Sequence, residues 1–138
     1  MPADGEAKAP SDALRAPPSR ILVIDDDLDI INSLENLFEG DGHRVEAFVD
    51  AREGLKRFAE APFDLVITDL VMPELSGWDV AETVKKKGGK VPVILITGWG
   101  DDLDFARIEK SGISQVIAKP FNMATVRKAV SEALPPPG

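Results

Sequence analysis

Residues 20–30 read RILVIDDDLDI, an apolar run that ends abruptly in a cluster of carboxylates. The run from Ile21 to Ile24 is typical of a strand that is covered on both faces of a parallel sheet. Asp25, Asp26 and Asp27 follow it directly. At about 4 Å and an effective dielectric constant of about 20, each pair of like charges costs about 4 kcal/mol. Such crowding at the end of a buried strand predicts a positive partner, either a cation or a basic side chain.

The pattern that begins with this stretch is repeated along the chain. Short β-branched runs predict strands at 20–25, 44–48, 64–69, 91–97 and 114–119. Each is followed by a segment with apolar residues at helical spacing. The five apolar stripes are Ile30, Ile31, Leu34, Leu37 and Phe38; Leu55, Phe58 and Ala59; Val80, Ala81 and Val84; Leu103, Phe105, Ala106 and Ile108; and Val126, Ala129, Val130 and Ala133. Five βα units in succession predict an α/β fold, a doubly wound (βα)5 three-layer sandwich with a five-stranded parallel sheet.

Composition limits the domain organisation. The chain has 138 residues and is 43% hydrophobic, which suits one compact domain. Most of the 11 prolines lie near the two ends. We therefore expect a disordered Ala/Pro-rich tail at 1–19, the folded domain at 20–134 and a Pro-rich tail at 135–138.

Charge and residue usage exclude several classes of function. The net charge of −8 argues against binding of nucleic acid or of an anionic membrane, since both need a basic surface. Without cysteine, the chain has no disulfide framework, thiol nucleophile or zinc-thiolate site. No stretch has the continuous apolar length of a membrane span or of a signal peptide. We expect a soluble, cytoplasmic protein.

Polar side chains follow four of the predicted strands. Asp25 and Asp26 close the first strand, Asp69 the third, Thr97 the fourth and Lys119 the fifth. Because ligands of open α/β sheets bind at the carboxyl ends of the strands, we expect these side chains to meet at one edge. Carboxylates suit Mg²⁺, with Mn²⁺ as a substitute, and lysine and threonine can contact phosphoryl oxygens. The set predicts a phosphoryl-transfer site in which one carboxylate forms an aspartyl phosphate.

Four motifs, in this order, resemble the receiver domain of two-component response regulators over residues 20–134. They are ILVIDDD, DLVITDLVMPELSGWD, VPVILITGWGD and VIAKPF. The resemblance implies that Asp69 accepts a phosphoryl group from the phosphohistidine of a partner. It also implies a full set of neighbours: Asp25, Asp26, Asp69 and the backbone carbonyl of Val71 as ligands of Mg²⁺, and Thr97 and Lys119 as contacts of the incoming phosphoryl group.

A receiver domain implies a signalling switch rather than an enzyme, limited to self-phosphotransfer and slow autodephosphorylation. The implied donor is a sensor histidine kinase or a histidine phosphotransfer protein. The output partner is not named by the sequence. We expect no direct binding of nucleic acid or membrane, and either a monomer or a phosphorylation-dependent dimer.

Two features depart from the usual pattern of the family. Val116 stands where many receivers have an aromatic residue whose rotation accompanies activation. Val71 and Trp99 border the implied path of the hydrolytic water, and neither side chain can orient a water well. We therefore expect the aspartyl phosphate to hydrolyse slowly. The resemblance also implies a cis peptide at Lys119-Pro120, a bond type that adopts the cis form at low cost.

Three polar residues are expected to have local roles only. Asp27 is predicted to cap the first helix, and Asp29 to lie in its first turn, where acidic groups complement the helix dipole. His43, the only histidine of the chain, is predicted to be a solvated loop residue. The chain therefore offers no phosphodonor histidine of its own.

Two other classes of function fit part of the pattern. Asp25 and Asp27 after a strand also resemble the opening of haloacid-dehalogenase-like phosphatases, in which Asp25 would be the nucleophile and Asp101-Asp102 a later acidic pair. That interpretation leaves Asp69 without a role, and the chain lacks the length for the remainder of such an enzyme. The other alternative is a non-phosphorylated pseudo-receiver that only binds a partner. The complete set of site residues argues against it.

Overall fold

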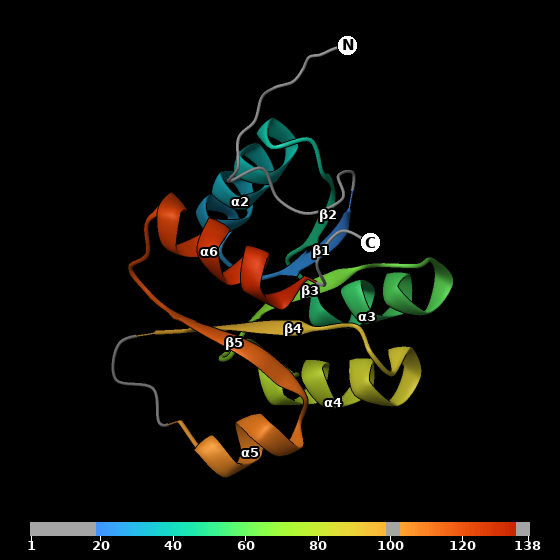
Figure 1. Cartoon of the computed structure of the whole chain (residues 1–138). Helices are drawn as coiled ribbons and strands as arrows, with labels where there is room; N and C mark the ends of the chain where they lie inside the picture. Colours follow the sequence, from blue (N-terminus) through green and yellow to red (C-terminus); the bar gives the residue numbers. More distant parts are fainter. Residues whose placement is uncertain (1–18, 99–102, 135–138) are drawn as a thin grey trace.

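The computed structural model describes residues 19–98 and 103–134. Its centre is a five-stranded sheet in which every neighbouring pair is parallel, in the order β2-β1-β3-β4-β5 (Figure 1). The strands are β1 (Arg20–Ile24), β2 (Arg44–Phe48), β3 (Leu65–Asp69), β4 (Val93–Thr97) and β5 (Ile113–Ala118). The helices are α2 (Leu28–Gly40), α3 (Ala51–Glu60), α4 (Gly77–Gly88), α5 (Phe105–Lys110) and α6 (Met123–Ala133). The predicted α/β doubly wound fold is confirmed.

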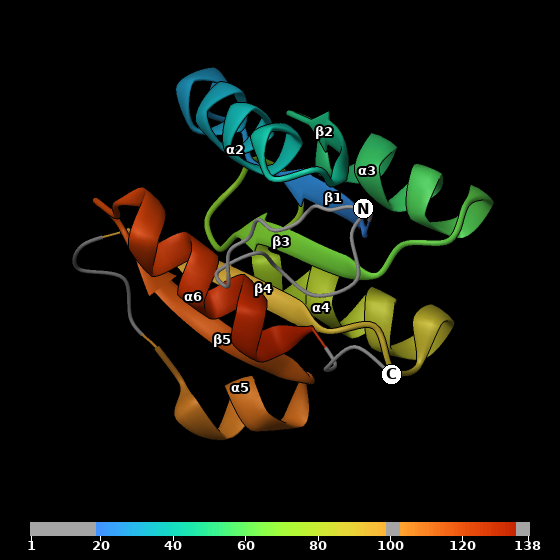
Figure 2. The same cartoon turned by 45° about the horizontal axis from the view of Figure 1, so that its top comes forward.

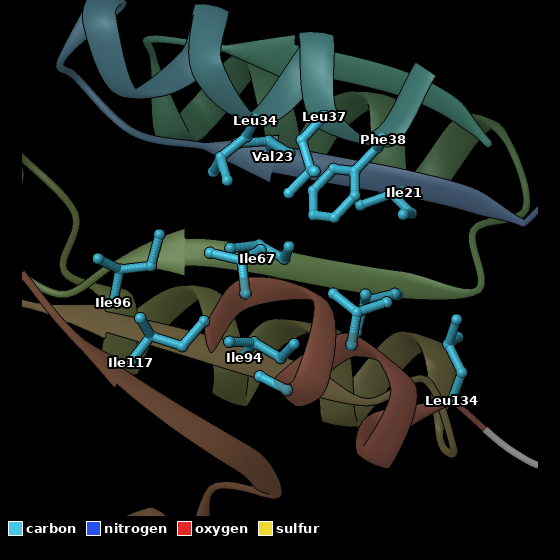
Figure 3. Close-up of a cluster of buried hydrophobic side chains, with 14 of the residues drawn as sticks. Ile21, Val23, Leu34, Leu37, Phe38, Ile67, Ile94, Ile96, Ile117 and Leu134 are labelled. Carbon is cyan, nitrogen blue, oxygen red and sulfur yellow. The ribbon is translucent and has the colours of Figure 1, made fainter. Parts of the chain in front are cut away.

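The helices form two layers, one on each face of the sheet (Figure 2). On one face, α2 and α6 cover alternate residues of the strands. Figure 3 shows Leu34 and Phe38 of α2 packed against Ile21 and Val23 of β1. On the other face, α3, α4 and α5 lie over the remaining strand residues, such as Leu22. The central strands are therefore buried on both sides, which explains their nearly continuous apolar sequence.

Strand register brings the ends of β1 and β3 together. Ile24 of β1 pairs with Thr68 of β3, so the next residues, Asp25 and Asp69, lie side by side at the carboxyl ends of these two strands. Asp69 in turn pairs with Ile96 of β4, directly before Thr97. The sheet thus places carboxylates from separate parts of the sequence at one edge.

Side-chain caps begin the helices that follow this edge. Asp27 is the N-cap of α2 and its side chain accepts a hydrogen bond from the backbone N–H of Asp29, which lies in the first turn. Both predictions are confirmed. Ser76 and Asp79 form a capping box at the start of α4. Such caps fix where each helix begins relative to the strand before it.

Several element boundaries and one helix differ from the sequence-based predictions. Strand β4 begins at Val93 rather than at residue 91, because Pro92 has no N–H to donate to the sheet. Half of the apolar stripe predicted for this segment is wrong: Phe105 is 76% exposed and Ala106 is also exposed, whereas Leu103 and Ile108 are partly buried against the core. No residue of α5 is fully buried. Ala59 of α3 is exposed too. The spacing matched a helix, but these segments have too little covering structure to bury every apolar position.

The prediction that His43 is solvated is wrong. His43 is only 4% exposed, and its Nδ1 accepts a hydrogen bond of 3.1 Å from the backbone N–H of Ser19. Ser19 is itself buried and its carbonyl accepts a bond from the N–H of Arg44. The contacts of the fold thus begin one residue before the expected boundary at residue 20, and they cover the ring.

Some expectations fall on residues that the structure does not describe. They are the tails at 1–18 and 135–138, Trp99, and the pair Asp101-Asp102. Within the described residues, no helix has the length and apolar character that crossing a membrane requires.

Candidate functional site

The five side chains singled out in the sequence come together at the carboxyl edge of the sheet. Asp25 follows β1, Asp69 ends β3, Thr97 ends β4 and Lys119 follows β5. Asp25, Asp26 and Asp69 each offer a carboxylate oxygen, and these three atoms lie within 4.8 Å of one another. Asp26 is exposed, whereas Asp25 is fully buried and Asp69 is 5% exposed. The cluster is therefore open to solvent on the side of Asp26.

Lys119 supplies a positive charge between two of the acids. Its Nζ lies 3.4 Å from Asp25 Oδ2 and 3.5 Å from Asp69 Oδ1. The backbone N–H of Lys119 donates to the carbonyl of Thr97, which ties the end of β5 to the end of β4. The expected cis peptide between Lys119 and Pro120 is present. The backbone of Lys119 is thereby fixed beside β4, and its side-chain ammonium lies next to the two acids.

One oxygen of each buried acid is fixed by a backbone N–H. Asp25 Oδ1 accepts from Asp27 at 2.9 Å, and Asp69 Oδ1 accepts from Leu70 at 2.9 Å. Asp25 Oδ2 is buried and has no hydrogen bond of good geometry within the described residues, and the nearest positive charge is the Lys119 ammonium at 3.4 Å. A buried carboxylate oxygen without a donor is costly. Such an oxygen fits a site that also receives a cation, and the all-oxygen set of acids suits Mg²⁺.

The pKa values show how strongly these groups interact. Burial and the neighbouring charge of Asp25 raise the pKa of Asp69 to about 6, against the opposing effect of Lys119. Burial likewise raises the pKa of Asp25. Burial alone would lower the pKa of Lys119, but the two carboxylates outweigh it and raise that pKa. The site thus holds more negative charge than one lysine balances.

Thr97 and Val71 are less directly engaged. Thr97 is 4% exposed, and its hydroxyl makes no hydrogen bond to the acids among the described residues. Val71 follows β3 by two residues, and its side chain is largely exposed. Val116, the expected departure on β5, is half-buried against the cluster that contains α3 and α4.

Sequence reasoning missed one residue that shapes the site. A Cβ built on Gly77 would lie 2.5 Å from the carbonyl oxygen of Asp69 and 2.9 Å from Leu70 Cα. The N–H of Gly77 also donates to the carbonyl of Leu70. Gly77 therefore lets the start of α4 pass directly against the backbone of the acidic residue. The signal available in the sequence was a glycine after Ser76, the residue that caps this helix.

Comparison with known protein families matches residues 21–131 to the response regulator receiver domain. The chain belongs to this family. Receiver domains are signalling switches of two-component systems, they work with histidine kinases, and the family binds Mg²⁺ at a cluster of acidic residues.

Curated relatives of this receiver domain are response regulators. It is 33% identical over 104 residues to the transcriptional regulatory protein CpxR homolog of Haemophilus influenzae, covering 75% of this chain and 45% of that protein. It is also 33% identical over 116 residues to the response regulator protein TodT of Pseudomonas putida, covering 84% of this chain and 51% of that protein. The chain thus spans about half the length of these curated relatives.

Solved structures show the same fold. A response regulator receiver domain from Clostridium thermocellum is 38% identical, with a TM-score of 0.76 over 83% of this chain and 93% of that one. The chemotaxis response regulator CheY4 of Vibrio cholerae is 25% identical, with a TM-score of 0.77 over 84% of this chain and 98% of that one.

Proposed function

We propose that this receiver domain accepts a phosphoryl group on Asp69 from the phosphohistidine of a sensor histidine kinase or a histidine phosphotransfer protein. The observation that carries the proposal is the position of Lys119. Its ammonium lies 3.4 Å from Asp25 and 3.5 Å from Asp69, within an acidic cluster that spans no more than 4.8 Å. A cation held among carboxylates can pair with phosphoryl oxygens as they arrive.

Asp69 is the proposed nucleophile. Its Oδ1 is occupied by the N–H of Leu70, whereas its Oδ2 accepts no hydrogen bond within the described part of the chain. We assign the attack on phosphorus to Oδ2: an O–P bond forms while the N–P bond to the partner's imidazole breaks, and the electron pair of that bond stays on the ring. Only the ionised carboxylate attacks, and its pKa of about 6 leaves it charged near neutral pH.

The proposed metal ligands are Asp25, Asp26, Asp69 and the backbone carbonyl of Val71. Mg²⁺, for which Mn²⁺ could substitute, would neutralise charge on the acids and on the phosphoryl oxygens. Asp27 donates a backbone N–H to Asp25 Oδ1, which holds this carboxylate in place for the role, and Asp25 Oδ2 lies 3.4 Å from Lys119 Nζ.

The proposed output is a shift between two conformations. Phosphate on Asp69 places new negative charge beside Lys119 and near Thr97, whose hydroxyl can donate to a phosphoryl oxygen. Drawing the end of β4 inward would favour the active member of a pre-existing pair of conformations. The switched protein would then act on an output partner, as a monomer or as a phosphorylation-dependent dimer, without direct nucleic acid or membrane binding by this chain.

The test is incubation with acetyl phosphate and Mg²⁺ followed by intact-mass measurement. The wild type should gain one phosphoryl group and Asp69→Asn should gain none. Asp27→Asn is the matched control: it removes a neighbouring charge but keeps a good N-cap, so it should still be phosphorylated.

The alternatives give different results in the same experiment. A pseudo-receiver would leave the wild type unmodified at every acetyl phosphate concentration. A haloacid-dehalogenase-like phosphatase that uses Asp25 would hydrolyse a phosphomonoester in the Asp69→Asn variant. The geometry does not favour that activity, since Asp27 serves as an exposed helix cap.

A further inference from the structure

The edge of the sheet opposite to the acidic cluster contains a buried histidine that the proposed phosphotransfer does not use. His43 precedes β2 and is 4% exposed. Its backbone N–H donates to the carbonyl of Phe38 in α2, which fixes the residue against the end of that helix. A buried imidazole in a fixed position can respond to pH only through its ring nitrogens, and both of them are constrained here.

The hydrogen bond from Ser19 determines the neutral form of this ring. Because Nδ1 accepts the backbone N–H of Ser19 at 3.1 Å, the ring hydrogen of the neutral form must be on Nε2. Nε2 is buried and has no hydrogen-bond partner within residues 19–98 and 103–134. A second proton has only Nδ1 as its site. An Nδ1–H and the Ser19 N–H would then be two donors facing each other.

Two charged groups act on the ring, and they come from two other parts of the fold. The carboxylates of Asp41, at the end of α2, and Asp64, before β3, favour the protonated ring, while burial outweighs them and lowers the pKa of His43. Both carboxylates already have partners: Asp41 binds Arg127 of α6 at 2.9 and 3.0 Å, and Asp64 accepts the N–H of Arg20 at 2.7 Å. The two carboxylates oppose the effect of burial on the pKa of His43, but neither of them offers the Ser19 N–H a new acceptor in place of Nδ1.

We propose that His43 acts as a proton-operated latch, which we define as a ring that holds Ser19 at the N-terminal end of β1 only while it is neutral. Uptake of one proton from solvent by Nδ1 breaks the hydrogen bond from Ser19 and loosens the chain where it enters β1. In the neutral state, two hydrogen bonds tie Ser19 to the start of β2: its N–H to His43, and its carbonyl to the N–H of Arg44 at 2.9 Å. Protonation removes the first and leaves the second. The latch responds to pH at the edge opposite to Asp69, so it does not depend on the proposed phosphotransfer.

The test is NMR, in which the only histidine of the chain gives an unambiguous ring signal. The ring should titrate with a midpoint below the value of about 6.5 that is normal for histidine. The Ser19 amide should change its shift with the same midpoint. Its protection from hydrogen exchange, corrected for the intrinsic rate, should fall by about tenfold, the factor that one ordinary hydrogen bond supplies. The amide of Val66 in β3 should keep its protection.

Two variants separate the latch from other titrations. His43→Asn places an amide oxygen near the position of Nδ1 without a titrating group, so the pH response of the Ser19 amide should disappear. Asp69→Asn removes a carboxyl group at the opposite edge of the sheet whose pKa is raised to about 6, and the response of Ser19 should remain.

Three results would overturn the proposal. They are a ring midpoint at or above the normal value, a Ser19 amide that does not follow the ring in the wild type, and a response that persists in His43→Asn. If His43→Asn does not fold, agreement or disagreement between the ring and amide midpoints in the wild type still decides the question.

Discussion

At the scale of single residues, the site is defined by an imbalance of charge. Asp25 and Asp69 share one lysine, and the pKa of Asp69 is raised to about 6. Between the ordinary carboxyl pKa and about pH 6, Asp69 is therefore protonated in the folded state but already ionised in the unfolded state. Stability from this group is present in acid and is lost as the pH rises through about 6.

Replacing Asp69 with Asn should remove this penalty. In metal-free buffer, we expect Asp69→Asn to raise the free energy of unfolding by about 1 to 3 kcal/mol at pH 8, with about half of that gain at pH 5. Urea unfolding at the two pH values measures the difference. Asp27→Asn, at the exposed cap, should show no such pH-dependent gain. An equal effect of Asp69→Asn at both pH values would contradict the assignment.

Asp26 should decide the response to Mg²⁺. The ion should stabilise the wild type by about 1.4 kcal/mol at ten times its Kd, because it binds the folded state only. Asp26→Asn should melt at a higher temperature than the wild type in chelator, since one repulsive charge is removed, and should lose the response to Mg²⁺. Asp29→Asn, an exposed acid of α2 outside the cluster, should keep it. Equal melting of the wild type with and without Mg²⁺ would count against the metal site.

Val71 bears on the lifetime of the phosphorylated state. Its side chain is exposed and cannot hold a water by hydrogen bonds, so the aspartyl phosphate should persist for minutes or longer in the purified protein. Val71→Asn should shorten that lifetime, and Val71→Ile should leave it unchanged. The decay is followed by intact mass after removal of acetyl phosphate. A wild-type lifetime of seconds would refute the expectation.

At the scale of elements, the contact between β3 and α4 leaves no room for an added side-chain atom. A Cβ at Gly77 would meet the backbone of Asp69 and Leu70. We expect Gly77→Ala to destabilise the fold by about 1 to 3 kcal/mol, the usual cost of overpacking, and to slow phosphorylation by shifting the loop beside Asp69.

Gly40 is the matched control for that substitution. It ends α2, and a Cβ there would meet nothing within 4 Å. Gly40→Ala should be neutral or stabilise by up to about 1 kcal/mol. Thermal unfolding and the rate of phosphorylation by acetyl phosphate would compare the pair. Similar effects of both substitutions would show that the close approach at Gly77 has no importance.

The elements also show why the sequence predicted the placement of the candidate site residues better than that of some of their surroundings. Asp25, Asp69 and Lys119 adjoin strands whose apolar runs are unambiguous, and parallel strands must end at the same edge. His43 accepts a hydrogen bond from Ser19, which lies directly before β1 and leaves no mark in the sequence around the histidine. The exposure of Phe105 likewise depends on how little structure covers α5. Contacts between distant segments of this kind have no local pattern.

At the scale of the whole molecule, stability should be distributed unevenly. The strands β1, β3 and β4 lie inside the sheet and are buried, whereas α5 has no buried residue. We expect the amide of Ile108 in α5 to exchange with solvent hydrogen at an opening free energy about 3 kcal/mol or more below that of Val66 in β3. Native-state hydrogen exchange measures both amides in one experiment. Equal protection of the two would show that α5 opens only with the whole domain.

The pairing of Ile24 with Thr68 has a consequence for how such a protein can vary. Each residue advances a strand by about 3.3 Å and turns the next side chain to the other face. A deletion of one residue inside β1 would therefore carry Asp25 out of reach of Lys119 even though every acid was still present. Loops can change length with far less effect. The position of the carboxylates thus depends on the number of aliphatic residues that precede them in the strand. Insertions and deletions should therefore be tolerated least within these strands.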